Sequence, residues 1–151
     1  MISIIGIFNI FGAFLAGVYG QKGTKKNGLS FIYGTRAVVI ALLLLLPKTE
    51  LYLYIFAAAM GFLWLSTVPL TNMIVAQIFG MRYLATLYGF VFVSHQIGSF
   101  LGIWLGGVIY DQSGSYDGMW YAGIIVGILA AIIHLPINEA PLVKSMETQN
   151  R

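Results

Sequence analysis

Five long apolar segments divide this chain, and the short stretches between them carry nearly all of its charged residues. Each segment supplies the roughly 20 residues that an α-helix needs to cross about 30 Å of hydrocarbon. With 59% hydrophobic and 9% charged residues, the chain lacks the polar surface that a soluble domain needs. The sequence therefore predicts an all-α membrane protein with five transmembrane helices, at residues 1–19, 29–47, 51–79, 84–110 and 119–137.

Two glycine-anchored stretches, residues 17–24 and 107–114, lie ninety positions apart, and each closes an apolar segment and opens a polar loop. This spacing indicates an internal repeat of three helices. Because three is an odd number, successive units are inverted relative to each other. Inverted three-helix repeats are typical of secondary transporters.

The repeat divides the chain into unequal parts. Residues 1–48 hold two helices of an incomplete first repeat with a basic loop, residues 49–138 hold a complete three-helix repeat, and residues 139–151 form a tail. We therefore expect one more helix before Met1. The alternative interpretation of residues 1–19, a signal peptide, lacks the basic n-region of such peptides.

The cationic residues that flank the predicted helices fall mostly on one side of the membrane. Lys48 flanks one side, whereas six residues flank the other: Lys22, Lys25, Lys26, Arg82, Lys144 and Arg151. By the positive-inside rule, we expect an external N-terminus and a cytoplasmic C-terminus, in the plasma or bacterial inner membrane. Membrane anchoring explains the net charge of +3, so the expected partner is the lipid bilayer and not a nucleic acid.

The first polar loop, Gly17-Val-Tyr-Gly-Gln21-Lys22-Gly-Thr-Lys25-Lys26, resembles the loop motif G-x-L-A-D-[RK]-x-G-[RK]-[RK] of the major facilitator superfamily. Here Gln21 stands in place of the acidic residue of the motif. The resemblance implies a gating loop with Asp111 as its counterpart in the second repeat.

Other stretches resemble bacterial relatives of the monocarboxylate transporters. They are residues 6–12, 33–36, 68–71 and 94–98, followed by Gly102, Gly106 and Asp111. This resemblance implies that the five helices correspond to helices eight to twelve of a twelve-helix transporter, an incomplete six-helix half. It also implies that upstream transporter helices are a partner of this chain.

Arg36 is the one formal charge inside any predicted span. At 1.5 Å per residue it lies about 10 Å beyond residue 29. Its functional interpretation is a cation that recognises a substrate carboxylate, and its structural interpretation is an ion pair or an inward-reaching anchor. Since no acidic residue lies in any span, its partner is a substrate, a backbone carbonyl or an acid outside this chain.

His95 lies eleven residues into its predicted helix, about 16 Å deep. An imidazole at this depth is a candidate for carrying the proton of a symporter, and Gln96 beside it for hydrogen bonding to a substrate. The alternative is a neutral histidine that bonds to a neighbouring helix. Gly98, Gly102 and Gly106 follow at four-residue spacing, which predicts a face for close helix packing. Gly12, Ala16 and Gly20 form a shorter ridge of the same kind.

Pro69 interrupts the third apolar segment among residues with hydroxyl and amide side chains. Proline removes one backbone hydrogen bond, so we expect a bend there. Thr71 and Asn72 beside it are candidates for a gate or a substrate contact, although such residues also repair a broken helix ladder. Asn9 is another polar group at mid-membrane depth, and bonding between helices is its alternative role.

The sequence shows no pattern typical of an enzyme, a metal site or a cofactor site, because it has no cysteine and its two histidines are isolated. The favoured interpretation is the C-terminal part of a secondary transporter for a small organic anion, coupled to a proton. One alternative is a small non-transporting membrane protein that binds a partner through its glycine faces. Another is a transporter for neutral or cationic compounds, in which Arg36 is structural.

Overall fold

The computed structural model describes residues 1–142, and this part of the chain is helical and contains no strand. Its elements are α1 (Ile2–Lys22), α2 (Lys25–Leu45), α3 (Glu50–Trp64), α4 (Thr67–Phe79), the short 3₁₀ turn η1 (Met81–Tyr83), α5 (Leu84–Ser113) and α6 (Asp117–His134). Within the described part, five segments are long and apolar enough to cross a membrane, with α3 and α4 together forming one of them. The predicted fold class is confirmed. Lys144 and Arg151 of the predicted tail lie outside the described residues.

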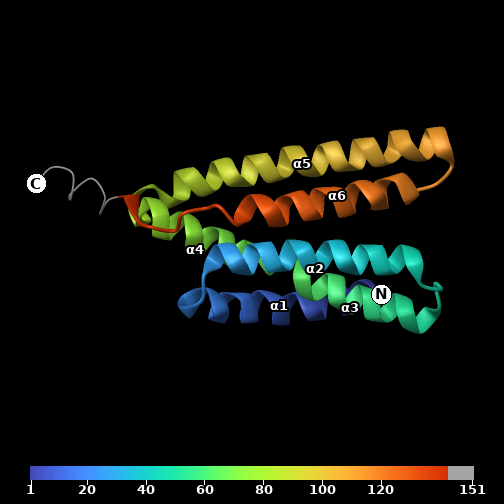
Figure 1. Cartoon of the computed structure of the whole chain (residues 1–151), viewed down its shortest axis with the longest axis horizontal. Helices are drawn as coiled ribbons and strands as arrows, with labels where there is room; N and C mark the ends of the chain where they lie inside the picture. Colours follow the sequence, from blue (N-terminus) through green and yellow to red (C-terminus); the bar gives the residue numbers. More distant parts are fainter. Residues whose placement is uncertain (143–151) are drawn as a thin grey trace, which may run out of the picture.

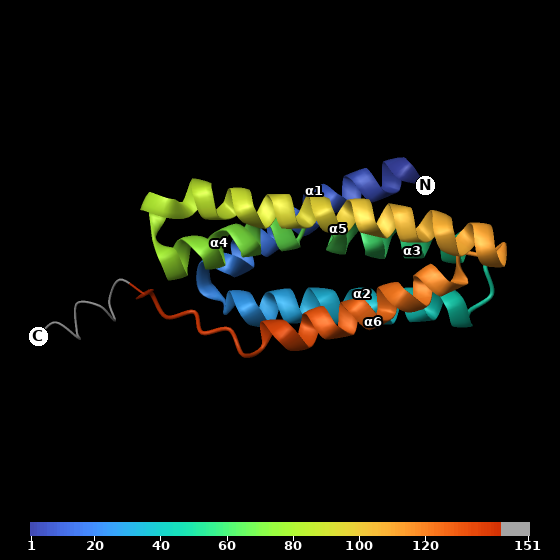
Figure 2. The same ribbon diagram turned by 90° about the horizontal axis from the view of Figure 1, so that it is seen from above.

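The helices run up and down along one axis (Figures 1 and 2). The α1–α2 connection, η1 and the end of α6 lie at one end of the bundle, and the α2–α3 and α5–α6 connections lie at the other. Helix α2 packs against α6, and α1 packs against α3 and α4. Lys22 and Arg82 therefore lie at the end opposite Lys48, as the charge pattern predicts.

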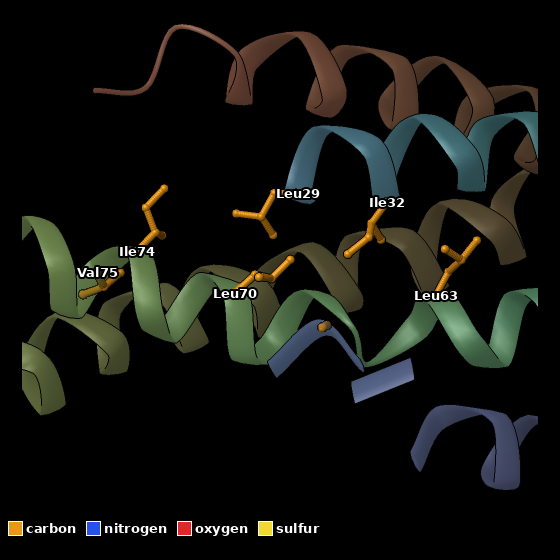
Figure 3. Close-up of a cluster of buried hydrophobic side chains, with 7 residues drawn as sticks. Leu29, Ile32, Leu63, Leu70, Ile74 and Val75 are labelled. Atoms are coloured by element: carbon orange, nitrogen blue, oxygen red, sulfur yellow. The ribbon is translucent and has the colours of Figure 1, made fainter. Parts of the chain in front are cut away.

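A cluster of buried side chains joins the two halves of this arrangement (Figure 3). Leu29 and Ile32 of α2 point toward Leu63 of α3 and Leu70 of α4. Leu29 and Leu70 are the largest side chains that are almost fully enclosed. Because lipid tails are as apolar as leucine, these side chains stabilise the bundle through close van der Waals packing and not through removal from water.

The small-residue ridge of α1 is confirmed as a packing surface, because Gly12, Ala16 and Gly20 are its buried residues. A Cβ atom on Gly12 would overlap the backbone carbonyl of Phe62 and lie 2.7 Å from the Ser66 hydroxyl oxygen. On the facing helix, a Cβ atom on Gly61 would lie 2.7 Å from the Cα atom of Ile5. Glycine on both helices lets the two backbones approach closely.

Several predicted helix ends differ from the structure by two to four residues, and three of the differences have a structural reason. Helix α2 begins at Lys25 and not at residue 29. Helix α6 ends at His134 and not at residue 137, because Pro136 has no N–H group to donate to the Ile132 carbonyl, which accepts from the N–H of Leu135 instead. The single predicted helix at residues 51–79 is two helices, α3 and α4.

The chain after α6 passes beside the beginning of α2, at the same end of the bundle. The Glu139 carboxylate accepts a hydrogen bond from the backbone N–H of Lys26, at 2.6 Å, and the Gln77 amide donates to the Glu139 carbonyl, at 2.9 Å. A carboxylate at a helix N-terminus satisfies a free N–H group and interacts favourably with the helix dipole. This contact explains why α2 starts a full turn before its apolar part.

Candidate functional site at the break between α3 and α4

Leu65 and Ser66 separate α3 from α4, and we call this point the helix break. It lies four residues before Pro69. Proline has no N–H group to donate to the carbonyl four residues earlier, which here belongs to Leu65. That carbonyl accepts instead from the N–H of Val68, at 3.1 Å, so the chain makes one tight turn before α4 begins. The predicted bend is therefore present, and it lies on the N-terminal side of Pro69.

Arg36 of α2 binds the end of α3. Its Nη2 group donates to the backbone carbonyls of Leu63 and Trp64, the second at 2.6 Å. The guanidinium carbon lies 5.3 Å from the ring centre of Tyr33 and 5.9 Å from that of Trp64. A cation at a helix C-terminus and beside aromatic rings is stabilised electrostatically. Of the three partners that the sequence left open, the structure shows the backbone carbonyl.

Arg36 keeps part of its hydrogen-bonding capacity unused. Its Nε atom is buried and has no hydrogen-bond partner among the described residues. A guanidinium carries five N–H groups in a planar fork, and this fork matches the two oxygens of a carboxylate. The group is thus anchored through Nη2, while its enclosed Nε donor has no partner within residues 1–142.

Asn9 of α1 also forms a hydrogen bond at the helix break. Its side-chain oxygen accepts from the backbone N–H of Leu65 at 3.2 Å. Since Arg36 binds the last carbonyls of α3 and Asn9 binds the N–H at the break, two further helices hold the break in place.

The hydroxyl groups near the break bond within their own helices. Ser66 donates to the Phe62 carbonyl and Thr71 to the Thr67 carbonyl, the latter at 2.8 Å. Both hydroxyls bond to the carbonyl four residues earlier, and neither bonds to the Leu65 carbonyl that Pro69 leaves without its helical donor. Asn72 differs, because within residues 1–142 its side chain makes no hydrogen bond, and it lines a pocket of about 410 Å³ together with Pro69 and Ala13.

His95 and Gln96 lie away from this group, on α5, where both side chains are exposed. The His95 ring lies 6.5 Å from that of Phe92 on its own helix. Among the described residues, no hydrogen bond links either side chain to Arg36 or Asn9. The structure thus brings together Arg36 and Asn9 around the helix break, and it leaves His95 and Gln96 on a separate surface.

The remaining predicted residues lie at the ends of the bundle or on the open face of α5. The α1–α2 connection and the helix ends beside it carry the residues predicted for the gating loop: Gly17, Gln21, Lys22, Lys25 and Lys26. Asp111 lies near the opposite end of the bundle, at the end of α5. Within the described part, nothing lies within 4 Å of a Cβ atom on Gly98 or Gly102, whereas one on Gly106 would lie 3.5 Å from Met119.

Sequence reasoning missed two features of this region. The first is the role of the Leu63 and Trp64 carbonyls as acceptors for Arg36. The sequence does contain a signal for it, because the helix break lies four residues before Pro69 and leaves carbonyls near it without helical donors. The Glu139 contact with α2 has no such signal, since residues 26 and 139 are brought together by the packing of α6 on α2.

The profile of the Major Facilitator Superfamily matches residues 1–149. The chain belongs to this superfamily. It is similar to an uncharacterized MFS-type transporter, YcxA, of Bacillus subtilis (strain 168), with 25% identity over 140 residues. The aligned part covers 89% of this chain and 34% of that relative, so the chain spans about a third of the relative's length. No solved structure matches the chain significantly.

Superfamily membership and the apolar helices identify a multi-pass membrane protein. Members of the superfamily are generally transporters and not enzymes. Residues 1–142 contain no group of three or more histidine, cysteine, aspartate or glutamate side chains that could hold a metal ion.

Proposed function

We propose that this chain is the C-terminal part of a secondary transporter, corresponding to helices eight to twelve, that moves a small organic anion of the monocarboxylate type by alternating access. Superfamily membership and the similarity to an MFS-type transporter support the transport class. Alternating access uses two halves around a site near the bilayer midplane. The upstream transporter helices are therefore the proposed partner.

The observation that carries the proposed substrate class is the state of Arg36. Arg36 is the one charge in the interior of a membrane helix, since the other charges within residues 1–142 lie at helix ends or in connections. Its Nε donor is buried without a partner among the described residues. An arginine at the centre of a membrane helix costs about 2.5 to 3.5 kcal/mol on insertion scales. The carbonyls of α3 and two aromatic rings offset part of this cost. An anionic carboxylate that reached the Nε side of the fork, which the protein encloses in this structure, would offset more.

Arg36 also offers a way to couple binding to movement. The nitrogen that binds the Leu63 and Trp64 carbonyls belongs to the same planar group that would receive the substrate. A substrate that reorients this group therefore changes what holds the helix break. In this proposal Asn9, Thr71 and Asn72 contact the substrate at the break, His95 carries the coupled proton on α5, and Gln96 beside it supplies a hydrogen-bonding group.

The uptake experiment uses the chain produced together with the coding sequence that precedes it in its genome. Uptake of radiolabelled lactate into proteoliposomes is compared between the unchanged protein, Arg36→Gln, and Arg82→Gln as a surface control. We expect Arg36→Gln to reduce uptake about ten- to hundred-fold, the effect of losing a charge-assisted hydrogen bond worth about 1.5 to 3 kcal/mol. Normal lactate uptake by that variant would remove the argument for an anionic substrate.

The proposed orientation places the α1–α2 connection in the cytoplasm and the N-terminus outside, by the positive-inside rule. Because the chain has no cysteine, a cysteine introduced at Thr24 or at Ser113 is the single site that a thiol reagent can label in that variant. We expect an impermeant maleimide to reach Ser113→Cys from outside the cell and Thr24→Cys only after lysis. Labelling of both from the same side would contradict the five-span topology.

One observation favours a second candidate, a membrane protein that binds a partner helix without transporting. Gly98 and Gly102 form an open small-residue face on α5. In that case, a Gly98→Cys variant would form cross-links to another protein. The upstream coding sequence would then contain no transporter helices.

A further inference from the structure

A groove of about 530 Å³ runs between α1 and α2, over α3 and α4. Leu15 and Phe31 form its two rims and are 51% and 72% exposed, so the groove opens outward. Its floor includes Ile32, Leu63 and Leu70 of the buried cluster (Figure 3). The groove is therefore lined mainly by hydrocarbon and faces the surroundings of the bundle.

The few polar groups along the groove are used within the protein or lie at its mouth. The Ser66 hydroxyl donates to the Phe62 carbonyl. The Tyr19 hydroxyl donates to the Thr24 carbonyl at 3.3 Å, at the end where Asn27 also lies. The interior thus presents no free polar group that would recognise a polar ligand.

The groove, together with the last turn of α1 beyond it, spans about one leaflet of a bilayer. It extends along α1 from Tyr19, near the helix end, to Gly12. From the end of α1 at Lys22 to Gly12 is about 15 Å at 1.5 Å per residue, half of a hydrocarbon core of about 30 Å.

Two lysines stand at the mouth of the groove, one on each wall. Lys22 follows the lining residue Tyr19 by three positions, and Lys25 precedes the lining residue Gly28 by three positions. Residues three apart share a helix face, so both lysines lie on the stripes that line the groove. Within residues 1–142, neither lysine forms an ion pair, and the nearby Glu139 carboxylate is bound by the Lys26 N–H group.

We propose that this groove binds an anionic phospholipid of the leaflet at the α1–α2 connection. One acyl chain fills the groove between Leu15 and Phe31, and the phosphate contacts the ammonium groups of Lys22 and Lys25. Basic pockets between transmembrane helices bind anionic headgroups in this way. This site is separate from Arg36 and does not depend on the transported substrate.

Native mass spectrometry of the 151-residue chain tests the proposal. The chain is released from nanodiscs that contain equal amounts of phosphatidylglycerol and phosphatidylcholine with identical acyl chains, and the two retained lipids are compared. We expect a preference for phosphatidylglycerol of up to roughly thirty-fold, the factor for two lysines at about 1 kcal/mol each. Equal retention of the two lipids would overturn the proposal.

Paired variants separate the headgroup from the acyl chain. Lys22→Gln with Lys25→Gln should abolish the preference but not the total amount of retained lipid, and Lys48→Gln at the other end should keep the preference. Leu15→Trp fills the groove and should reduce retention of both lipids, whereas Leu129→Trp on α6 should not, although Leu129 is also 51% exposed.

Two results would contradict the site. If Lys48→Gln lowers the preference as much as the double variant, net charge and not the groove selects the lipid. If soluble glycerol 3-phosphate displaces phosphatidylglycerol, the lysines bind a free anion without help from the acyl chain. Because each ratio compares two lipids in one sample, a variant that folds poorly loses both lipids and leaves the ratio readable.

Discussion

Helices α1 and α5 carry small residues at the same four-residue spacing, but within the described structure the α1 ridge is buried along its whole length and the α5 ridge only at Gly106. On α1, Gly12, Ala16 and Gly20 are buried against α3 and α4. On α5, Gly98 and Gly102 have open space before them within residues 1–142. A small-residue ridge permits close approach of another helix, and what lies opposite decides whether that approach occurs.

Polar side chains show the same contrast. Around the helix break, Arg36 and Asn9 bond from one helix to another. On α5, Ser94 donates to the Phe90 carbonyl and Ser99 to the His95 carbonyl, both at 3.0 Å and both within the helix. Arg36 and Asn9 thus hold helices together, whereas these groups of α5 satisfy only their own helix.

The largest expected effect comes from filling the ridge of α1. Gly12→Leu should destabilise the chain by about 3 kcal/mol, because its side chain has to displace the Phe62 backbone. Gly98→Leu, the matched change on α5, should not destabilise the chain, because nothing lies within 4 Å of its Cβ atom among the described residues and leucine has a higher helix propensity than glycine. The free energy of unfolding in a denaturant titration of the detergent-solubilised chain measures both. Equal losses would show that α5 packs as tightly as α1.

A smaller effect is expected at the helix break. Arg36→Gln should cost about 2 kcal/mol, because the carbonyls of Leu63 and Trp64 lose a charged donor. It should also speed hydrogen exchange in the last turn of α3. The control is Arg82→Gln, since Arg82 is exposed and its guanidinium contacts only the neighbouring Tyr83 ring among the described residues. Unchanged exchange in Arg36→Gln would mean that Asn9 alone holds the break.

The smallest effect is expected where the chain after α6 meets α2. Glu139→Gln keeps an acceptor for the Lys26 N–H group but removes the charge, so it should cost about 0.3 to 1 kcal/mol, the range for a charge at a helix end. Asp111→Asn at the C-terminal end of α5, where a negative charge opposes the dipole, should not destabilise. Thermal unfolding followed by circular dichroism, at low and high salt, compares the two. A larger loss of thermal stability in Asp111→Asn than in Glu139→Gln would contradict the helix-end interaction that we assign to Glu139.

Much of the fold was predictable because membrane insertion constrains each helix locally. The five apolar segments, the alternation of charge between the two ends and the ridge on α1 are properties of single stretches of sequence. The boundaries were less predictable. Helix α2 starts early because Glu139, more than one hundred residues away, binds its first turn.

The candidate site was predictable in its members but not in its grouping. The residues Arg36, Asn9 and Pro69 each stand out as a charge, an amide or a helix breaker inside an apolar segment. Their spacing along the chain does not say that Arg36 and Asn9 meet at the same break. His95 and Gln96 stand out equally, and the structure places them on another surface.

The sequence by itself determined that this chain forms membrane helices and that one of them breaks near Pro69, because hydrophobic length and a missing N–H group act within a few turns of the backbone. Tertiary structure alone decided what occupies the break. The carbonyls freed there bind Arg36 because α2 packs beside α3 and α4, and the N–H of Leu65 binds Asn9 because α1 packs on the other side. Hydrogen bonds between helices depend on distances across the bundle, and those distances are fixed only when the helices pack.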